Sequence, residues 1–222
     1  EIVAGHMVEY SGALFALFHD VSLTMGLFAL LQLDVPESWW MRQVECEECT
    51  TGSLAALQKY AEAQGAFEKA LAAGPDKDLA DQTHLNLGLA YYNLAQAGSA
   101  ELLPKAIEQL RTVTEKFASS QYVPKALFYL GEALYTQKKL PEAVAAYQTI
   151  ISKHPQSELR ADALYALGVT QEELKQHAEA AKTYDTLLKE FPKHAKTTEV
   201  GMRKGETLFA AGNYAEAEKR FA

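Results

Sequence analysis

Apolar residues recur along most of the chain with the spacing of amphipathic helices, and the pattern repeats. Four glycines stand in matching apolar contexts, namely Gly88, Gly131, Gly168 and Gly205, and the last three are 37 residues apart. The first interval is 43 residues, and the small residues 97–100 inside it predict a lengthened turn. A period of this length predicts stacked helical units, each too small to bury its own apolar face.

After each glycine, apolar residues at spacings of three and four predict a second helix. Such spacings put the residues on one helical face. The three sets are Ala106, Leu110 and Val113; Ala143, Tyr147 and Ile150; and Ala180, Tyr184 and Leu187. Pro155 and Pro192 follow two of these helices and predict where the units end. We expect the three sets, and the glycines, to be packing residues.

The Leu-Gly pair, the apolar residue that follows it, the alanine of the second helix and the closing proline together resemble the tetratricopeptide repeat (TPR) family. The resemblance covers about residues 44–222, as four to five repeats of which the last is truncated. It implies an all-α fold, a right-handed α-α superhelix (TPR solenoid) of antiparallel helix pairs with a concave groove. Lys204 departs from the pattern, because the other units have Leu there.

The repeat also predicts a helix pair near the start of this array. Residues 60–70 repeat the pattern of residues 214–221, which predicts a second helix there, and residues 44–58 would supply the first helix of the same unit. The run Thr50-Thr51-Gly52-Ser53 has low helix propensity. The chain begins at Glu1 and stops at Ala222 within a helical pattern, so we expect it to be a piece of a longer protein.

In TPR proteins the concave groove is built from first-helix positions outside the packing pattern. The resemblance assigns to a partner-binding groove Leu85, Leu89, Tyr92, Phe128, Glu132, Tyr135, Tyr165, Val169, Glu172, Met202, Glu206 and Phe209. For each of them, packing between repeats is an equal alternative. Members that grip a chaperone carboxylate place Lys and Asn at such positions, so that ligand is not expected. An apolar, partly acidic groove suits an extended or helical peptide with apolar anchors and some positive charge.

Residues 1–43 do not follow the repeat and form a separate apolar segment. Residues 13–33 are long enough to span a bilayer, although ionised Asp20 would cost about 2.5–3.5 kcal/mol there. The alternative is a helix that caps the first repeat. Separately, Gly5-His6-Met7 has an equal interpretation as a cloning remnant, in which case the native chain begins near Met7. The first 18 residues are similar to a membrane subunit of respiratory complex I and hydrogenases, but too few residues match to imply quinone or proton chemistry.

Charge and candidate chemistry argue against an enzyme and against nucleic acid as a partner. Twenty-one Lys and Arg against 29 Asp and Glu give a net charge of −8, without the basic surface that a phosphate backbone requires. Cys46 and Cys49 have the spacing of a metal or redox pair, yet a closed zinc site needs four ligands and none follow. An incidental pair is the favoured interpretation, and no catalytic residue, metal or cofactor is expected.

Three segments between units, residues 117–122, 153–157 and 190–194, are similar to those of bacterial envelope TPR proteins. These include the periplasmic coordinator of the Tol-Pal system and the lipoprotein of outer-membrane protein assembly. The similarity implies a non-catalytic scaffold that binds a protein or peptide in a bacterial cell envelope or periplasmic complex. The alternatives are a cytoplasmic location, and a membrane-anchored assembly or self-association module that uses residues 13–33.

Overall fold

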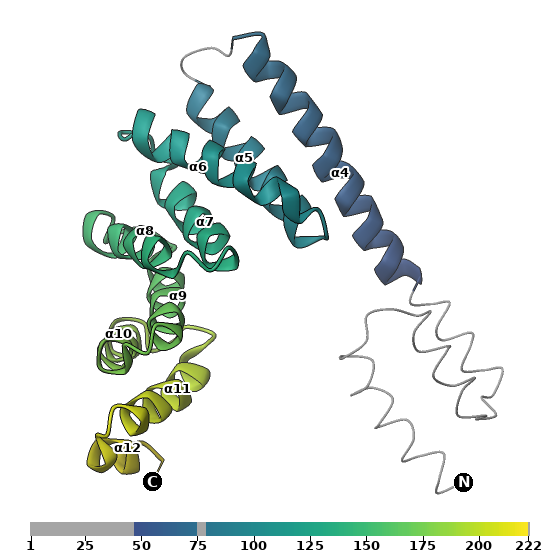
Figure 1. Cartoon of the computed structure of the whole chain (residues 1–222). Coiled ribbons are helices and arrows are strands. Elements are labelled where there is room, and N and C mark those ends of the chain that lie inside the picture. Colours follow the sequence, from purple (N-terminus) through teal and green to yellow (C-terminus); the bar gives the residue numbers. More distant parts are fainter. Residues whose placement is uncertain (1–46, 75–78, 222) are drawn as a thin grey trace, which may run out of the picture. The chain divides into compact units, whose positions relative to one another are not determined.

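The computed structural model describes residues 47–74 and 79–221, and every regular element in them is helical (Figure 1). The elements are α4 (Glu47–Ala72), α5 (Ala80–Gln96), a 3-10 helix η1 (Ala100–Leu102), α6 (Leu103–Lys116), α7 (Val123–Thr136), α8 (Leu140–Lys153), α9 (Arg160–Glu173), α10 (His177–Glu190), α11 (Thr197–Ala210) and α12 (Tyr214–Phe221). The predicted segment 1–43 and its apolar stretch 13–33 lie outside the described residues. Their role as cap or membrane anchor stays a prediction.

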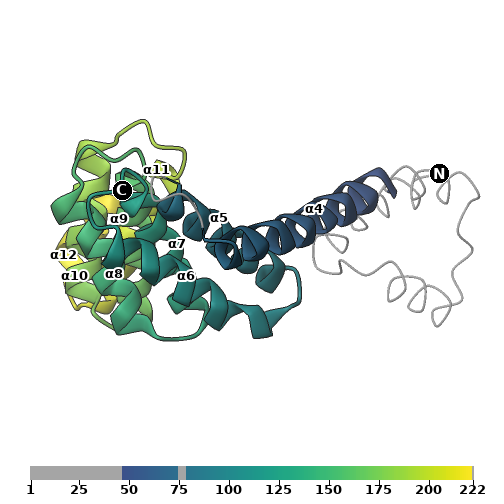
Figure 2. The same cartoon turned by 90° about the horizontal axis from the view of Figure 1, so that it is seen from above.

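From α5 onward the helices form pairs. The first helices of the pairs are α5, α7, α9 and α11, and the second helices are α6, α8, α10 and α12. Each helix packs on the next one in sequence, and α5 and α9 also contact α7. Figure 2 shows the labels of first and second helices on two different sides of the stack. The helices α7, α9 and α11 each have 14 residues and begin 37 residues apart, which is the period of the glycines.

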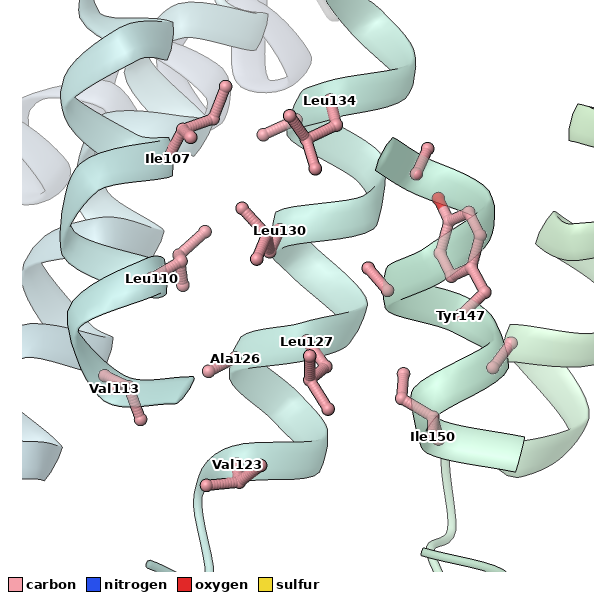
Figure 3. Close-up of a cluster of buried hydrophobic side chains, with 14 of the residues drawn as sticks. Ile107, Leu110, Val113, Val123, Ala126, Leu127, Leu130, Leu134, Tyr147 and Ile150 are labelled. Carbon is pink, nitrogen blue, oxygen red and sulfur yellow. The ribbon is translucent and has the colours of Figure 1, made fainter. Parts of the chain in front are cut away.

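The predicted packing sets form the core. All nine of their residues are buried, at exposures of 0 or 1%. Figure 3 shows Leu110 of α6 pointing toward Leu130 of α7, with Tyr147 and Ile150 of α8 on the other side of α7. Burying a side chain of this size stabilises the fold by about 1.5–3 kcal/mol. The partner helix α8 covers only one side of α7. The other side of α7 packs against α6 of the preceding pair.

The longer first interval has two causes. Helix α5 has 17 residues instead of 14, and the 3-10 helix η1 lies between it and α6. Gly98 begins this connection with a φ of 122°, a backbone conformation that glycine adopts at little cost. The predicted lengthened turn at residues 97–100 is therefore confirmed.

Each of the other three turns inside the pairs contains one residue in the left-handed backbone conformation. Gly212 has a φ of 79° at the end of α11, whereas Lys138 and Lys175 adopt a φ of 59° at the ends of α7 and α9. At the turn after α7, the N–H of Lys138 donates to the carbonyl of Tyr135, and the N–H of Lys139 donates to that of Leu134. These bonds satisfy carbonyl groups at the helix end and reverse the chain toward the second helix.

The start of the array differs from the predicted helix pair. Residues 47–72 form one continuous helix, α4, instead of two. Residues 54–72 are rich in Ala, Leu, Glu, Gln and Lys and contain no proline. The helix therefore continues through the point where a turn between the two expected helices would lie. Phe67 and Leu71 of α4 pack against a cluster around Leu87 and Tyr91. This part of α4 therefore packs like the second helix that the pattern predicts.

The described helices do not include a membrane span. Within residues 47–74 and 79–221, none is both long and apolar enough to cross a bilayer.

Candidate functional site

A pocket of about 210 Å³ opens between side chains of the first helices α7 and α9. Helix α7 contributes Phe128, Glu132 and Tyr135, whose spacings of four and three residues place them on one helical face. Helix α9 contributes Tyr165 and Val169, which are four residues apart and so also lie on one helical face. The structure thus brings together five of the residues that the sequence assigned to the groove.

Five further residues complete the pocket wall, and they were not among the residues predicted for the groove. They are Tyr147, Asp162, Ala166, Thr170 and Lys196. Asp162 lies one turn before Tyr165 on the same face of α9, so extending the predicted stripe by one turn would have found it, and Ala166 lies one turn after Asp162. Lys196 lies just before α11, where no helical periodicity marks it.

Tyr147 belongs to the core and to the pocket at once. Its side chain is 1% exposed, as its packing pattern predicted, yet its hydroxyl donates a hydrogen bond to Glu132 Oε1 at 2.6 Å. Burial, and then the Glu132 carboxylate, raise the pKa of Tyr147 far above the usual tyrosine value. The hydroxyl therefore stays protonated and holds the Glu132 carboxylate in place.

A second tyrosine of the pocket connects two repeats. The hydroxyl of Tyr135 in α7 donates to the carboxylate of Glu173 in α9, whose Oε2 lies 3.1 Å from Lys138 Nζ. The bond from Tyr135, and then that from Lys138, lower the pKa of Glu173. Burial and the hydrogen bond to Glu173 raise the pKa of Tyr135 to about 12. This arrangement fixes one wall of the pocket.

Tyr165 connects the next two repeats in the same way. Its hydroxyl donates to Glu199 Oε1 of α11 at 2.6 Å, and Arg203 Nε lies 3.0 Å from the same oxygen. The bond from Tyr165, followed by that from Arg203, lowers the pKa of Glu199. Lys196 places Nζ 3.7 Å from the centroid of the Tyr165 ring, which is a cation–π contact.

Glu172, another predicted groove residue, lies outside the pocket. Its Oε2 accepts a hydrogen bond at 2.8 Å from Arg203, the residue that also pairs with Glu199. The side chain of Glu172 is 21% exposed. Its observed role is to join α9 to α11.

In the first pair, the predicted residues pack instead of lining the pocket. Leu85 is 2% exposed and belongs to the main core cluster, so it is a packing residue, the alternative that the sequence left open. Leu89 and Tyr92 are partly buried against the same cluster, and the rings of Tyr92 and Tyr129 lie 5.6 Å apart. These side chains pack in or against the core cluster that also contains residues of α6, α7 and α8.

In the last pair, the predicted residues are exposed but do not line the pocket. Met202 and Phe209 are 59% and 63% exposed, and Glu206 is exposed beside them. The rings of Phe209 and Tyr214 lie 5.1 Å apart. Met202, Phe209 and Tyr214 are therefore exposed apolar side chains on α11 and the start of α12, outside the pocket.

The described residues offer the pocket no metal chemistry. Residues 47–74 and 79–221 contain no group of three or more His, Cys, Asp or Glu side chains placed to hold a metal ion. Cys46 and the side chain of Cys49 lie outside what the structure describes, so the role of this pair stays a prediction. The pocket combines four aromatic rings, small apolar groups, two carboxylates and one ammonium group. These groups offer apolar contact, hydrogen-bond acceptors and charge to a ligand.

The four helix pairs, with glycines 43, 37 and 37 residues apart in their first helices, define an all-α solenoid of antiparallel helices. Residues 97–158 and 162–194 match two family models, each described as tetratricopeptide repeat. These residues therefore form tetratricopeptide repeats, as the sequence predicted. No curated protein matches the sequence.

Solved structures of other proteins have the same fold. A crystal structure of MamA protein aligns with a TM-score of 0.60 at 25% identity, over 79% of this chain and 82% of that one. BtubC from P. vanneervenii aligns with a TM-score of 0.55 at 18% identity, over 73% and 70%. The apo form of RapI aligns with a TM-score of 0.55 at 20% identity, over 74% and 47%. The predicted fold class is thus confirmed.

Proposed function

We propose that this chain is a non-catalytic interaction scaffold that holds a segment of a partner protein in the pocket between α7 and α9. The observation that carries the proposal is the convergence of five predicted groove residues on one pocket. Tetratricopeptide repeats present rigid surfaces of this kind, and a partner segment with apolar anchors fits a groove between helices.

The rigidity of the pocket supports binding over catalysis. Tyr135, Tyr147 and Tyr165 each donate their hydroxyl to a carboxylate, so the aromatic wall is held in place before a ligand arrives. A preformed site loses little side-chain freedom on binding, and this favours affinity. The bonded hydroxyls have raised pKa values, so they stay protonated near neutral pH and are weak acids for proton transfer.

For the location, we propose a bacterial cell envelope complex, with the cytoplasm as the alternative. The support is the sequence of the turns between the pairs, residues 117–122, 153–157 and 190–194. Fractionation of the native host, with detection of the whole protein by antibody, tests this proposal separately from the binding proposal.

Affinity capture tests the scaffold function. The whole chain is used as bait in host extract, together with Val169→Gln, which extends a polar side chain into the pocket, and Ala145→Gln, which makes a comparable change at an exposed position on α8. Captured proteins are identified by mass spectrometry and their binding is then measured with purified components. We expect Val169→Gln to lose a partner that Ala145→Gln retains. Equal capture by both variants would move the function away from the pocket.

Self-association is the second candidate function, and the exposed surface of Met202, Phe209 and Tyr214 favours it. Phe209 and Tyr214 are in ring contact, and exposed large apolar side chains that lie together are candidates for contact with another protein surface. Sedimentation velocity of the whole chain and of Phe209→Ser, with and without mild detergent, tests this candidate. A dimer that dissociates in Phe209→Ser supports it, whereas a concentration-independent monomer removes it.

A further inference from the structure

The pocket already contains one positive charge held on an aromatic ring. Nζ of Lys196 lies 3.7 Å from the ring centroid of Tyr165, and Cζ of Arg203 lies 6.0 Å from it. Cations prefer the face of an aromatic ring because the ring quadrupole is negative there. The chain's own lysine thus shows which kind of group this wall accommodates.

Two carboxylates line the same pocket, and each uses only one of its oxygens. Glu132 accepts the Tyr147 hydroxyl through Oε1, and Asp162 Oδ1 lies 3.3 Å from Nε2 of His194. Within residues 47–74 and 79–221, Glu132 Oε2 and Asp162 Oδ2 make no hydrogen bond or ion pair. A carboxylate oxygen accepts more than one hydrogen bond, so both groups retain acceptor capacity.

The charges around the pocket are unbalanced. The lining includes Glu132 and Asp162 against the single cation Lys196. The charged groups next to it are already paired, Glu173 with Lys138 and Glu199 with Arg203. The whole chain carries a net charge of −8, which favours the approach of a positively charged partner.

From this arrangement we infer that the pocket recognises a lysine or arginine side chain of the partner segment. The cationic group lies between the aromatic wall and the carboxylates of Glu132 and Asp162, and neighbouring apolar residues of the partner lie on Phe128 and Val169. Aromatic rings and carboxylates together recognise ammonium and guanidinium groups through cation–π contacts and charge-assisted hydrogen bonds. The inference rests on the proposed scaffold function and specifies the chemistry of its ligand.

Lys196 has a definite role in this arrangement. Its ammonium group occupies the Tyr165 ring that a partner cation would use, so it competes with the ligand and also repels it. Removing this charge leaves Glu132 and Asp162 without a cation among the residues that line the pocket. We therefore expect a variant without Lys196 to bind a basic peptide more tightly than the native chain does.

The test begins with a random library of displayed 12-residue peptides selected on the whole chain. Selected peptides are synthesised with a fluorescent label, and their affinities are measured by fluorescence polarisation. In each peptide the basic residues are replaced in turn by norleucine, which keeps the apolar stem and removes the charge. We expect lysine or arginine to be enriched next to apolar residues, and one norleucine substitution to weaken binding about tenfold or more.

Protein variants locate the charge requirement. Glu132→Gln and Asp162→Asn keep the shape of the side chains, and each is expected to weaken a basic peptide about fivefold to tenfold, whereas Lys196→Met strengthens it about threefold to tenfold. Glu206→Gln is the matched control, because Glu206 follows Gly205 as Glu132 follows Gly131 but is exposed outside the pocket. Circular dichroism melting curves confirm that each variant is folded.

The outcomes separate this inference from the proposed function. Peptides that need Val169 but tolerate norleucine, Glu132→Gln and Asp162→Asn would leave the scaffold function intact and overturn the inference. Selection of acidic peptides, or weaker binding by Lys196→Met, would overturn it as well. A library that gives no peptide sensitive to Val169→Gln contradicts both the inference and the pocket as the binding site.

Discussion

A Cβ atom on Gly131 would lie 2.5 Å from Cε1 of Tyr147, closer than real Cβ atoms approach a neighbour. Gly168 is related to Tyr184 in the same way, and Gly88 is similarly close to Leu110. In these three pairs, the first and second helices therefore touch where the first helix has no side chain. This close approach explains why a glycine recurs with the period of the repeat.

Replacing Gly131 by alanine should destabilise the fold. The ring of Tyr147 cannot move aside, because it is 1% exposed and its hydroxyl is bonded to Glu132. Overpacking of this kind costs about 1–3 kcal/mol, which the better helix propensity of alanine offsets by up to about 1 kcal/mol. Urea unfolding followed by circular dichroism should show a lower free energy of unfolding for Gly131→Ala.

Gly65→Ala is the control for this experiment. Gly65 lies within helix α4, and a Cβ atom there would meet nothing within 4 Å. The same substitution should therefore leave stability unchanged or raise it by up to about 1 kcal/mol. If both variants lost stability equally, the contact between Gly131 and Tyr147 would not be the cause.

Lys175→Gly should stabilise the chain. Lys175 has a φ of 59°, and a non-glycine residue in this region costs about 1 kcal/mol or more. Glycine removes that strain but gains freedom in the unfolded chain, so the net gain should be about 0.5–1 kcal/mol. Lys182→Gly, at an exposed position inside α10, should instead cost about 1 kcal/mol. Chemical denaturation of both variants measures the contrast, and a loss of stability in Lys175→Gly would refute it.

The bond from Tyr165 to Glu199 should make stability depend on pH. The pKa of Glu199 is below its ordinary value of 4.5 in the folded chain, so its contribution is present above pH 4.5 and is lost as the pH falls through the folded pKa. Tyr165→Phe should cost up to about 1 kcal/mol at pH 7, and this difference should shrink toward pH 3. Urea unfolding from pH 7 to pH 3 measures it.

Tyr129→Phe is the matched control for this pH dependence. Among the described residues, the hydroxyl of Tyr129 has no hydrogen-bond partner, although its ring packs against Tyr92. Its removal should change stability little, and equally at both ends of the pH range. A pH-independent loss in Tyr165→Phe would show that packing, and not the bond to Glu199, accounts for the effect.

Lys204→Leu should be neutral or stabilising by up to about 1 kcal/mol. Lys204 occupies the position of Leu87, Leu130 and Leu167, which are 2–6% exposed, and it pairs with Asp185 at 2.6 Å. Asp185 keeps a second partner, Lys189, at 2.6 Å, so the substitution does not leave its charge unpaired. Lys204→Ala, which loses both the pair and the packing, should be less stable than either. Thermal melting ranks the three proteins.

The sequence predicted the packing of the repeats better than their start. The period of the glycines and the three apolar sets defined the helix pairs, because these residues interact mainly within their own pair and with adjacent pairs. Where a pair was expected, over residues 44–58 and 60–70, the structure has the single helix α4. The pattern of residues 60–70 was correct for a second helix, but no turn signal separated it from the residues before it.

The pocket could be predicted only in part, for a physical reason. Phe128, Glu132 and Tyr165 could be predicted because their places in the first helices follow from helical spacing relative to the repeated glycines. Leu85 lies three residues before Gly88, as Phe128 lies three residues before Gly131, but Leu85 is a buried member of the core cluster whereas Phe128 is only partly buried against it. Lys196 reaches the ring of Tyr165 from a turn in the next repeat, and such a contact depends on tertiary arrangement rather than on local pattern.

The hydrogen bonds that cross between repeats make neighbouring units non-interchangeable. Tyr135 meets Glu173 at one junction, and Tyr165 meets Glu199 at the next, so each junction has its own donor and acceptor. An engineered chain with its units shuffled would keep the apolar packing but lose these bonds, because each tyrosine would face the wrong helix. The linear order of the units is therefore itself a specificity element, and the array behaves as an ordered series rather than a set of equivalent modules.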